Sequence, residues 1–306
     1  MDHERAPKVV ALGGGHGLSA TLRAVRRYSS DLVAIVSVAD DGGSSGRLRQ
    51  AMPELPAPGD VRRCLSALAD DGSPLGQALE HRFDRGDLEG HALGNLLLAA
   101  LAEELGSFGA AVDEVGRHIG AVGRVLPATD GPVALEGLRD AGRGYAEGQR
   151  RVVGQVAVQN ADGIARLSLQ PPDPPSCDDV TKAILAADQV VIGPGSLFTS
   201  VLAAAIVPAV RAALHDTAAQ RVFVANLRPQ VPETKGFTAA DEVSALLDHD
   251  VPLDVVVCDP ARPCGFHHPS LPCIEAPIAD DGGHAHHPER LAQVLSSLWA
   301  GRSEVG

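Results

Sequence analysis

The chain has 306 residues, enough for one large α/β domain or two small ones around a substantial core. Its formal net charge is −13 and aromatic residues make up 3% of it. Together these values argue against a nucleic-acid partner, because phosphates need a basic face and single-stranded bases need aromatic stacking partners. A small anionic ligand needs only a local cluster of donors and is not excluded.

Location can also be predicted from the sequence. The N-terminal stretch 1–15 places acidic residues before a short apolar run, which does not match a secretory signal. The longest apolar candidate, 96–102, is far shorter than the roughly 20 residues of a membrane span. The five cysteines are an odd number and form no disulfide framework. We therefore expect a reduced, cytoplasmic protein without a membrane span.

Strands and helices alternate from the N-terminus onward. An apolar run over 8–12 ends in glycines and predicts a buried parallel strand, 17–28 has helical spacing, and 32–39 predicts a second strand. This order is a βαβ unit, whose crossover is right-handed. Four helical patterns follow, which we expect to form a lobe near 59–120 at one end of the sheet: 60–70, 74–83, 91–105 and 108–120.

The pattern changes near 151–169. RVVGQVAVQ and IARLSLQ alternate on either side of Asn160–Gly163, which predicts a β-hairpin with its turn there. A proline-rich connector at 170–179 follows, and then the α/β rhythm returns. The further predicted helices and strands lie at 178–187, 189–192, 221–225, 238–248, 254–258 and 288–299.

These elements predict a single α/β domain over 1–306. We expect a Rossmann-like, doubly wound and mainly parallel sheet, with the helical lobe near 59–120 and the hairpin insertion near 151–169. A polar C-terminal tail is expected from about 262.

The first candidate ligand site is ALGGGHGLSA, residues 11–20, which follows the first strand and fits the looser form of the dinucleotide fingerprint. Glycines allow a pyrophosphate to approach the backbone, and the next helix offers N–H groups at its N-terminus. The alternative is a tight turn without a ligand. On this fingerprint alone NAD(P) is not excluded. The candidate binding residues are Gly13, Gly14, Gly15, His16, Gly17 and Leu18.

The second is SVADDGGSSGRLR, residues 37–49. Asp40 and Asp41 end the second strand, where open α/β sheets bind their ligands, and tandem acids suit ribose hydroxyls or a hydrated Mg²⁺ ion. A flexible loop then supplies hydroxyl and N–H groups, and Arg47 supplies charge. The alternative is a solvated turn with helix-capping side chains. The loop candidates are Gly42, Gly43 and Ser44.

The third is PAPGDVRRCLSAL, residues 56–68. Arg62 and Arg63 fall in the first turn of a predicted helix, where the helix dipole disfavours cations, so we expect an anion nearby. Gly59 and Asp60 precede them; Asp60 is either a helix N-cap or, with the tandem acids, a magnesium ligand.

Two more stretches carry candidate residues. His91 and Asn95 are four residues apart, on one face of a helix, and are either ligand contacts or satisfied polar groups of a buried helix. Residues 190–201 repeat the order of strand, glycine turn and helix, which predicts a second anion site. We expect the two turns to face each other and hold a diphosphate from both sides. This second turn contributes Gly193, Pro194, Gly195, Ser196 and Thr199.

Cysteine and histidine gather toward the C-terminus. Cys264 and Cys273 enclose His267 and His268, a composition that suggests zinc, but the spacing matches no standard metal site. We expect a flexible polar tail here. The sequence contains no Gly-x-Ser-x-Gly elbow and no Walker lysine motif.

Six motifs occur in a fixed order: GGGHGLS, VADDGGSSGRLR, PGDVRRCL, GHALGNLLLAAL, VVIGPGSLFTS and ANLRPQVPETKGF. Together they resemble the YvcK/CuvA-type gluconeogenesis factor family, in the CofD-like superfamily of 2-phospho-L-lactate transferase, over about residues 8–260. The resemblance implies a CofD-like α/β fold and a nucleotide diphosphate ligand such as a UDP-sugar. It also implies a role in growth on gluconeogenic carbon sources and in cell shape and wall homeostasis, and adds the binding candidates Asn226, Glu233 and Thr234.

The sequence departs from the family pattern at two places. His16 stands where the first loop often has threonine, and the last motif has Pro232 and Lys235 where the family often has glycine and aspartate. We expect the hydroxyl contact of the first loop and the sugar-side or base-side contacts of the last motif to differ.

Two functions follow from these residues. The first is a nucleotide-sugar-binding regulator that acts with protein partners of the cell wall or as a homo-oligomer. The alternative is a magnesium-dependent transferase of a phosphoryl-containing group from a nucleotide diphosphate donor. Its catalytic candidates are Asp40, Asp41 and Asp60, which would hold the metal, and Arg63, which would stabilise the transition state. A third class, an NAD(P)-dependent redox enzyme, rests on the glycine fingerprint alone.

Overall fold

A parallel sheet forms the centre of the protein. The computed structural model describes residues 6–140, 144–146, 150–265 and 271–303. Within them seven strands pair in the order β10-β9-β8-β7-β1-β2-β3, which confirms the predicted doubly wound, mainly parallel sheet. The strands are β1 (Lys8–Gly13), β2 (Asp31–Val36), β3 (Arg124–Pro127), β7 (Gln189–Ile192), β8 (Gln220–Val224), β9 (Val255–Cys258) and β10 (Cys273–Glu275).

The strand sequences suit a sheet that is covered on both faces. β1, β2 and β7 are rich in valine, leucine and isoleucine, and Val10 of β1 lies opposite Val33 of β2 and Val190 of β7. All three valines stand in nearly continuous apolar runs, which are typical of parallel strands buried on both sides. The short β3 was not predicted from its four-residue sequence.

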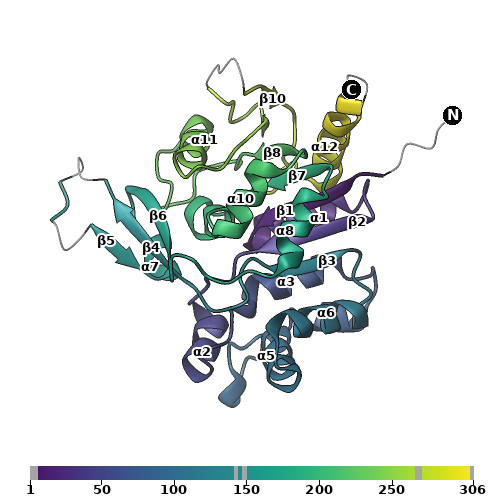
Figure 1. Cartoon of the computed structure of the whole chain (residues 1–306), viewed down its shortest axis with the longest axis vertical. Coiled ribbons are helices and arrows are strands. Elements are labelled where there is room, and N and C mark those ends of the chain that lie inside the picture. The colour runs from purple at the N-terminus through teal and green to yellow at the C-terminus, as the bar shows by residue number, and fades with distance from the viewer. Residues whose placement is uncertain (1–5, 141–143, 147–149, 266–270, 304–306) are drawn as a thin grey trace.

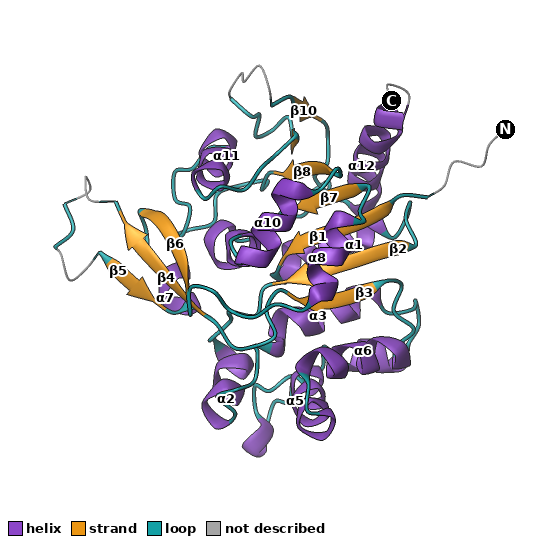
Figure 2. Cartoon of the chain, in the orientation of Figure 1, coloured by secondary structure: helices purple, strands orange, loops and turns teal. Residues whose placement is uncertain are grey.

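Helices supply that cover. In Figure 2, α8 (Asp178–Leu185) and α10 (Pro208–Asp216) lie in front of the sheet and α3 (Pro58–Leu68) lies behind it. α1 (Gly15–Val25) packs against α3 and against α12 (Pro288–Ser303), so these three share one layer. The fold is therefore a three-layer α/β arrangement.

The remaining helices form the predicted lobe and the connections of the second half. α2 and α5 lie at the lower end of the molecule in Figure 1, away from the strands. The helices not yet given are α2 (Gly43–Ala51), α4 (Pro74–Ala78), η1 (Gly86–Leu88), α5 (Leu93–Leu105), α6 (Phe108–His118), α7 (Gln155–Gln159), η4 (Leu197–Leu202), α9 (Ala203–Ala205) and α11 (Ala239–Asp248).

The stretch after Asp41 is a helix and not the flexible loop that its glycines and serines predict. Residues 43–51 form α2, whose Ser44 side chain is buried. Arg49 holds this helix in place by donating hydrogen bonds to the carbonyl oxygens of Asp40 and Val133, at 3.2 and 3.0 Å. Tertiary contacts therefore outweigh the weak helix propensity of the sequence.

The antiparallel insertion is present, but its predicted pairing is wrong. β5 (Arg151–Val153) and β6 (Ile164–Gln170) both pair with β4 (Ala134–Arg139), which lies between them. The second half of the predicted first strand is the short helix α7, packed against β4. The insertion projects to the left in Figure 1. Its alternation was read correctly as antiparallel structure, but β4 was not predicted.

The polar, flexible tail predicted from about 262 is also corrected. β10 adds a strand to the edge of the sheet, and α12 packs against α1 with Leu291 and Leu295 fully buried. Ile278, between the two elements, is fully buried as well. The C-terminal segment therefore belongs to the core. His267 and His268, two members of the predicted Cys/His cluster, lie outside the described residues.

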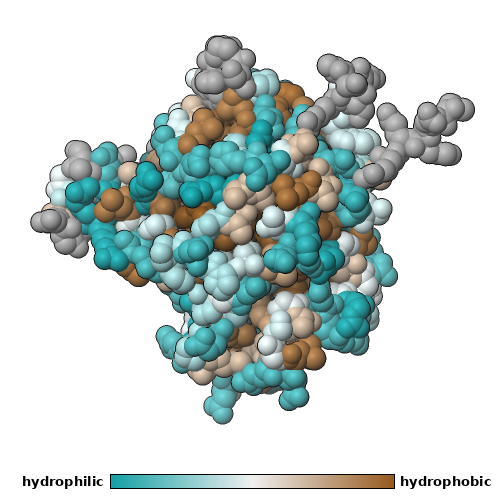
Figure 3. Space-filling model, in the orientation of Figure 1, coloured by the Kyte–Doolittle hydropathy of each residue, from teal (hydrophilic) through white to brown (hydrophobic). Residues whose placement is uncertain are grey.

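On the face shown in Figure 3, hydrophilic residues alternate with small apolar patches. In the described part of the chain, no single helix combines the length and apolar composition needed to cross a membrane. The bent pair 197–205 and 208–216 passes that test only when both helices are counted together, and buried core helices pass it too.

Candidate functional site

The strand order reverses at β1, which has β2 and β3 on one side and β7 to β10 on the other. A cleft of about 810 Å³ opens there, at the carboxyl ends of the strands. Open α/β sheets bind ligands at this switch point, and the volume falls within the usual range for ligand pockets.

Most of the predicted site residues meet in this cleft. Those that line it are Gly14, Gly15, His16, Gly17, Asp40, Gly42, Gly43, Ser44, Gly59, Asp60, Arg62, Arg63, Asn95, Pro194, Gly195, Ser196, Thr199, Asn226 and Glu233. Those outside its lining are Gly13, Leu18, Asp41, Arg47, His91, Gly193 and Thr234. The structure thus gathers residues from six distant sequence motifs around one space.

The two glycine turns touch each other directly. A Cβ atom on Gly17 would lie 2.8 Å from the Cα atom of Gly195 and closer still to the carbonyl group of Pro194. A Cβ atom on Gly14 would lie 2.5 Å from the Asp60 carboxylate. The close approach of backbone and side chain therefore requires glycine at both positions, and the Asp60 carboxylate accepts a hydrogen bond from the backbone N–H of Gly15 at the start of α1.

The second turn does not offer the free anion site that its sequence predicts. The carboxylate of Glu233 accepts hydrogen bonds from the backbone N–H groups of Phe198 and Thr199 at 3.0 and 2.8 Å, at the start of the π-helical η4. The protein's own buried acid therefore occupies the helix N-terminus. Burial raises the pKa of Glu233, although these hydrogen bonds oppose the shift.

The Asn226 side chain holds this turn in place through hydrogen bonds to its backbone. It accepts a hydrogen bond from the backbone N–H of Gly195 at 3.0 Å and donates one to the Gly195 carbonyl at 2.9 Å. It also donates to Glu242, whose carboxylate pairs with Arg262 at 3.1 Å. Asn226 lines the cleft mainly as a brace for the second glycine turn.

Asp40 and Asp60 converge from neighbouring elements. Asp40 follows β2, Asp60 lies in the first turn of α3, and a Cβ atom on Gly59 would lie 3.0 Å from the Asp40 carboxylate. Burial raises the pKa of Asp60, Arg63 lowers it, and the charge of Asp40 raises it further. A cation would relieve the repulsion between these two acids, so they fit a hydrated Mg²⁺ ion. The N-cap role considered for Asp60 belongs to Ala57.

Asp41 points elsewhere, which corrects the prediction that the tandem acids act together. Its carboxylate accepts hydrogen bonds from the backbone N–H groups of Gln155 and Val156, both at 2.9 Å, and thereby caps α7. The helix-capping alternative holds for this residue, with the capped helix far along the sequence. Asp40 alone of the pair lines the cleft.

Arg62 is a buried cation with unused donors. Its side chain is 1% exposed and pairs with Glu80 at 3.3 Å, while its Nε and Nη1 groups have no hydrogen-bond partner among the described residues. Gly94 makes room for it, since a Cβ atom there would lie 2.7 Å from the Arg62 Cγ. Burial lowers the pKa of Arg62. Buried polar groups are normally paired, so these donors indicate a ligand contact.

The arginines of α3 do not lie where the sequence predicts. The helix begins at Pro58, so Arg62 and Arg63 fall in its second turn and the unfavourable dipole argument does not apply. Arg63 donates a hydrogen bond to Asp60 at 2.8 Å. The expected nearby anions are therefore, in part, the protein's own Asp60 and Glu80.

Ser44 and Asn95 form a small network at the floor of the cleft. The Asn95 amide donates to the Ser44 hydroxyl at 3.1 Å, and His91 contacts the same hydroxyl at 3.1 Å from outside the lining. The Asn95 Oδ1 atom has no partner among the described residues. Burial lowers the pKa of His91, and Arg47 lowers it further. Arg47 itself donates to the Glu89 carbonyl at 2.8 Å and does not face the cleft.

The other predicted residues that do not line the cleft take part in the fold. Leu18 is fully buried in the core, and Gly13 ends β1. The Thr234 hydroxyl accepts a hydrogen bond from the backbone N–H of Gln230 at 2.8 Å and so shapes the 230–234 turn.

Several lining residues were not predicted from the sequence. They are Gln155 and Gln159 of α7, Arg82 before α5, Arg228 and Gln230 after β8, and His284 and His286 before α12. Arg228 and Gln230 stand in the last of the six motifs but were not chosen from it, the others stand in none of the motifs, and the two histidines were assigned to a tail. His286 is buried, its ring contacts the Ala225 carbonyl at 3.2 Å, and burial lowers its pKa.

A mainly parallel sheet with glycine turns and a polar cleft at its switch point makes the chain a doubly wound α/β protein. A protein-family model described as 2-phospho-L-lactate transferase CofD matches residues 9–264. A UPF0052 family member from Bacillus halodurans, known from its crystal structure, superimposes with a TM-score of 0.86 at 32% identity, over 95% of this chain and 99% of the other.

Named relatives show to which group of this family the chain belongs. A gluconeogenesis factor homologue of Mycobacterium tuberculosis is 43% identical over 95% of this chain and 90% of its own length. The gluconeogenesis factor of Bacillus subtilis is 40% identical over 79% of this chain and 75% of its own. The chain therefore belongs to the CofD family and, within it, to the gluconeogenesis factor group.

Proposed function

We propose that the cleft binds a nucleotide diphosphate derivative, a UDP-sugar in the first instance, and that the protein acts as a ligand-responsive regulator. The observation that carries this proposal is Arg62, a buried cation in the cleft whose Nε and Nη1 donors lack a partner among the described residues. Arginine donors suit the oxygens of a phosphate, and a buried site strengthens such contacts.

The charges around Arg62 support an anionic ligand. Arg63, Arg82 and Arg228 also line the cleft, together with the acids Asp40, Asp60 and Glu233. Glu233 is already bonded to backbone N–H groups, and Asp60 is paired with Arg63 and bonded to the backbone N–H of Gly15. Two of the three acids therefore already have partners, whereas Arg62 keeps two groups without a partner among the described residues.

The polar side chains farther along the cleft suit the rest of such a ligand. Asn95 has an unpaired oxygen among the described residues, and Gln155, Gln159 and Gln230 bring amides from two other elements. Amide and carboxylate groups hydrogen-bond the hydroxyls of ribose and of a sugar. Without a bound metal ion, the Asp40 carboxylate can accept hydrogen bonds from the same hydroxyls.

Direct binding measurements test the proposal. Purified protein is titrated by calorimetry with UDP-glucose, UDP-N-acetylglucosamine, UDP, UMP, NADH and NADPH, with and without Mg²⁺. We expect binding of the uridine diphosphate compounds, and weaker binding of the corresponding monophosphate because the Arg62 region then has fewer phosphate oxygens to contact. Absence of binding by every nucleotide diphosphate overturns the proposal, and binding of NAD(P)H alone replaces it with a redox cofactor site.

The pair Asp40 and Asp60 favours a second function, transfer of a phosphoryl-containing group with Mg²⁺. The matching family model carries the name of such a transferase, and the two carboxylates converge beside Arg63. When bound, the ion would neutralise charge on the departing phosphate. Asp40 and Asp60 would hold it, and Arg63 would stabilise the developing charge. Magnesium-dependent consumption of a nucleotide diphosphate donor, lost in Asp40→Asn, would promote this function over the first.

The cellular role is proposed from the family to which the chain belongs. We expect the protein to act in the cytoplasm, in growth on gluconeogenic carbon sources and in cell shape and wall homeostasis, through protein partners or as a homo-oligomer. Complementation of a strain that lacks the corresponding gene, by the wild-type chain and by Arg62→Met, tests whether the cleft serves that role. Equal rescue by both chains would show that the cellular role does not depend on Arg62 and the cleft.

A further inference from the structure

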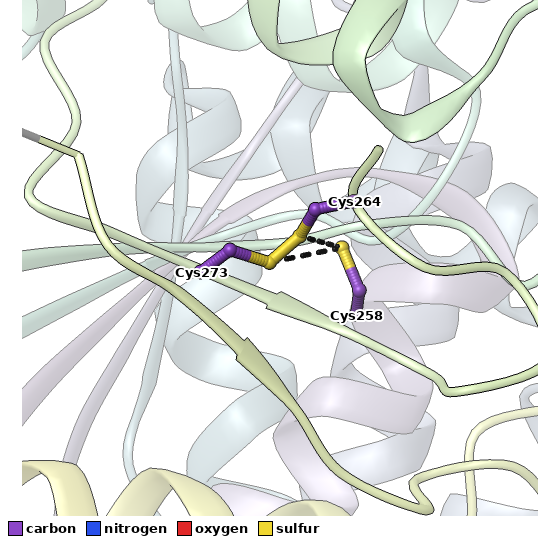
Figure 4. Close-up of a disulfide and its surroundings, with 3 residues drawn as sticks. All are labelled: Cys258, Cys264 and Cys273. Atoms are coloured by element: carbon purple, nitrogen blue, oxygen red, sulfur yellow. Dashed lines mark hydrogen bonds between the residues drawn. A yellow bond between two sulfur atoms is a disulfide. The ribbon is translucent and has the colours of Figure 1, made fainter. Parts of the chain in front are cut away.

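Three cysteine sulfurs converge at the β10 edge of the sheet (Figure 4). Cys258 ends β9, Cys273 begins the neighbouring β10, and Cys264 lies in the connection between them. Cys264 and Cys273 are joined as a disulfide, which corrects the expectation that all five cysteines are reduced. The Cys258 sulfur lies 2.6 Å from that of Cys264 and 3.7 Å from that of Cys273. All three sulfurs lie within 4.8 Å of one another, close enough to bind a single ion.

The fold enforces this convergence. β9 and β10 are parallel neighbours, with Cys273 opposite Val256 and Glu275 opposite Cys258. The two strand cysteines are therefore offset by only two positions, and the connection returns Cys264 to the same place. Cys258 and Cys264 are buried, whereas Cys64 and Cys177 are isolated from the group.

Cys258 is buried and takes no part in the disulfide. Thiols coordinate metal ions as thiolates, and a bound ion deprotonates the thiols that coordinate it.

One sulfur pair of the cluster already has the spacing of a tetrahedral site, and Cys264 would have to move away from both other sulfurs. Zinc–thiolate bonds of about 2.3 Å place two sulfurs about 3.8 Å apart in a tetrahedral site, close to the 3.7 Å between Cys258 and Cys273. The Cα atoms of Cys264 and Cys273 are 6.6 Å apart, near the upper end of the roughly 4.4–6.8 Å found for disulfides. The backbone thus leaves room for these two sulfurs to separate onto one ion.

We propose that Cys258, Cys264 and Cys273 form a thiolate site for a soft divalent cation, Zn²⁺ as the ordinary case, which is available when the 264–273 disulfide is reduced. A dithiol reductant transfers two electrons and two protons to the disulfide and itself becomes a disulfide. The ion then replaces the thiol protons, which pass to solvent. Three thiolates fill three tetrahedral positions and a solvent molecule completes the fourth.

This site would connect metal and redox state to the wall of the cleft. Asp259, the residue after Cys258, accepts hydrogen bonds from the backbone N–H groups of Ile278 and Ala279, both at 3.0 Å, on the segment that leads to His286. Arg262, between two of the cysteines, donates to the Asn226 carbonyl at 2.6 Å. The Arg262 contact reaches Asn226, which lines the cleft, and the Asp259 contacts hold the segment that leads to His286 in its lining.

Metal content is the first test. The full chain is reduced with a phosphine, loaded with Zn²⁺, passed through a desalting column and analysed by mass spectrometry for zinc per chain. We expect near-stoichiometric zinc in the reduced protein and almost none in the oxidised protein. Equal, low zinc in both states, with all five thiols of the reduced protein accessible to maleimide after denaturation, overturns the proposal.

Variants locate the ligands. Cys258→Ser and Cys273→Ser are expected to weaken zinc affinity by more than about tenfold, the lower end of the cost of disturbing even a group behind the ligands. Cys177→Ser, outside the cluster, serves as the matched control and should retain full zinc. Equal zinc in the cluster variants and the control would place the metal elsewhere.

Cobalt provides a measurement that needs no variant. Co²⁺ added to the reduced wild-type chain should give sulfur-to-metal charge-transfer absorption, displaced by Zn²⁺ and absent after oxidation. A cobalt spectrum without sulfur bands rules out thiolate ligation even if every variant unfolds. Because none of these readouts uses the cleft, their outcome is independent of nucleotide binding.

Discussion

Replacing Arg62 with methionine should weaken ligand binding without weakening the fold. Methionine keeps the apolar stem that packs against Gly94 and removes the guanidinium, which is 1% exposed and carries two unpartnered groups among the described residues. The lost partner, Glu80, has a side chain that is 45% exposed and can be hydrated again. No uncompensated charge is therefore left in the core.

The expected size of the effect follows from these contacts. A hydrogen bond to a charged group contributes about 1.5–3 kcal/mol, which corresponds to a loss of about 10- to 100-fold in affinity for a diphosphate ligand. Removing one partner of an ion pair is costly when the other charge stays buried, but the Glu80 side chain is 45% exposed and regains water. We thus expect a higher Kd together with a nearly unchanged Tm of the ligand-free protein.

Calorimetry with UDP-glucose and a thermal melt without ligand are the two assays. Arg124→Gln is the matched control, because Arg124 is half exposed, pairs with Asp113 and Asp179, and lies outside the cleft. It should leave Kd unchanged. An Arg62→Met protein that binds as tightly as the wild type would refute the assignment of these donors to the phosphates. A large fall in its Tm would show instead that the guanidinium stabilises the fold.

Three further results are expected. Gly17→Ala should lower the free energy of unfolding by about 1–3 kcal/mol, because the new Cβ atom would meet the backbone of Pro194 and Gly195. Urea titration measures this loss. Gly109→Ala in α6 is the control, since a Cβ atom there would have only one neighbour within 4 Å. Asp41→Ala should cost about 1 kcal/mol through the lost cap of α7 while calorimetry finds nucleotide affinity retained. The pKa of Glu233 is raised by burial, so the folded state holds its proton more tightly and the wild type loses stability as pH rises above the ordinary glutamate value of about 4.3. Glu233→Gln should therefore gain stability relative to wild type between pH 4 and pH 7 in thermal melts, and parallel curves would contradict the argument.

Local patterns determined much of the fold. The apolar runs ending in glycine at β1 and β7, and the helical spacing of α5 and α6, are short-range signals that specify strand, turn and helix without distant contacts. Their order also implied a parallel sheet with a switch point, which the strand order confirms. The same patterns predicted most of the residues that line the cleft, because glycine turns after strands lie at one edge of such a sheet.

Other features depend on contacts that no local pattern encodes. β4 pairs with both β5 and β6, and no turn signal links it to the latter. Asp40 and Asp41 are adjacent in sequence but have different roles. Asp41 caps the distant helix α7, whereas Asp40 lines the cleft. Glu233 likewise closes a helix N-terminus some 35 residues away in sequence, which no motif could predict.

The sequence by itself determined the chemistry that is present: glycine turns, acids, arginines and cysteines in a parallel α/β frame. Only the tertiary structure decided which of them meet. It set Arg62 into the cleft with donors that lack a partner among the described residues, turned Asp41 and Arg47 away, and placed the free thiol of Cys258 beside the Cys264–Cys273 disulfide. The physical reason is that strand and helix periodicity is a short-range property, whereas side-chain partners are chosen by packing between segments far apart in the chain.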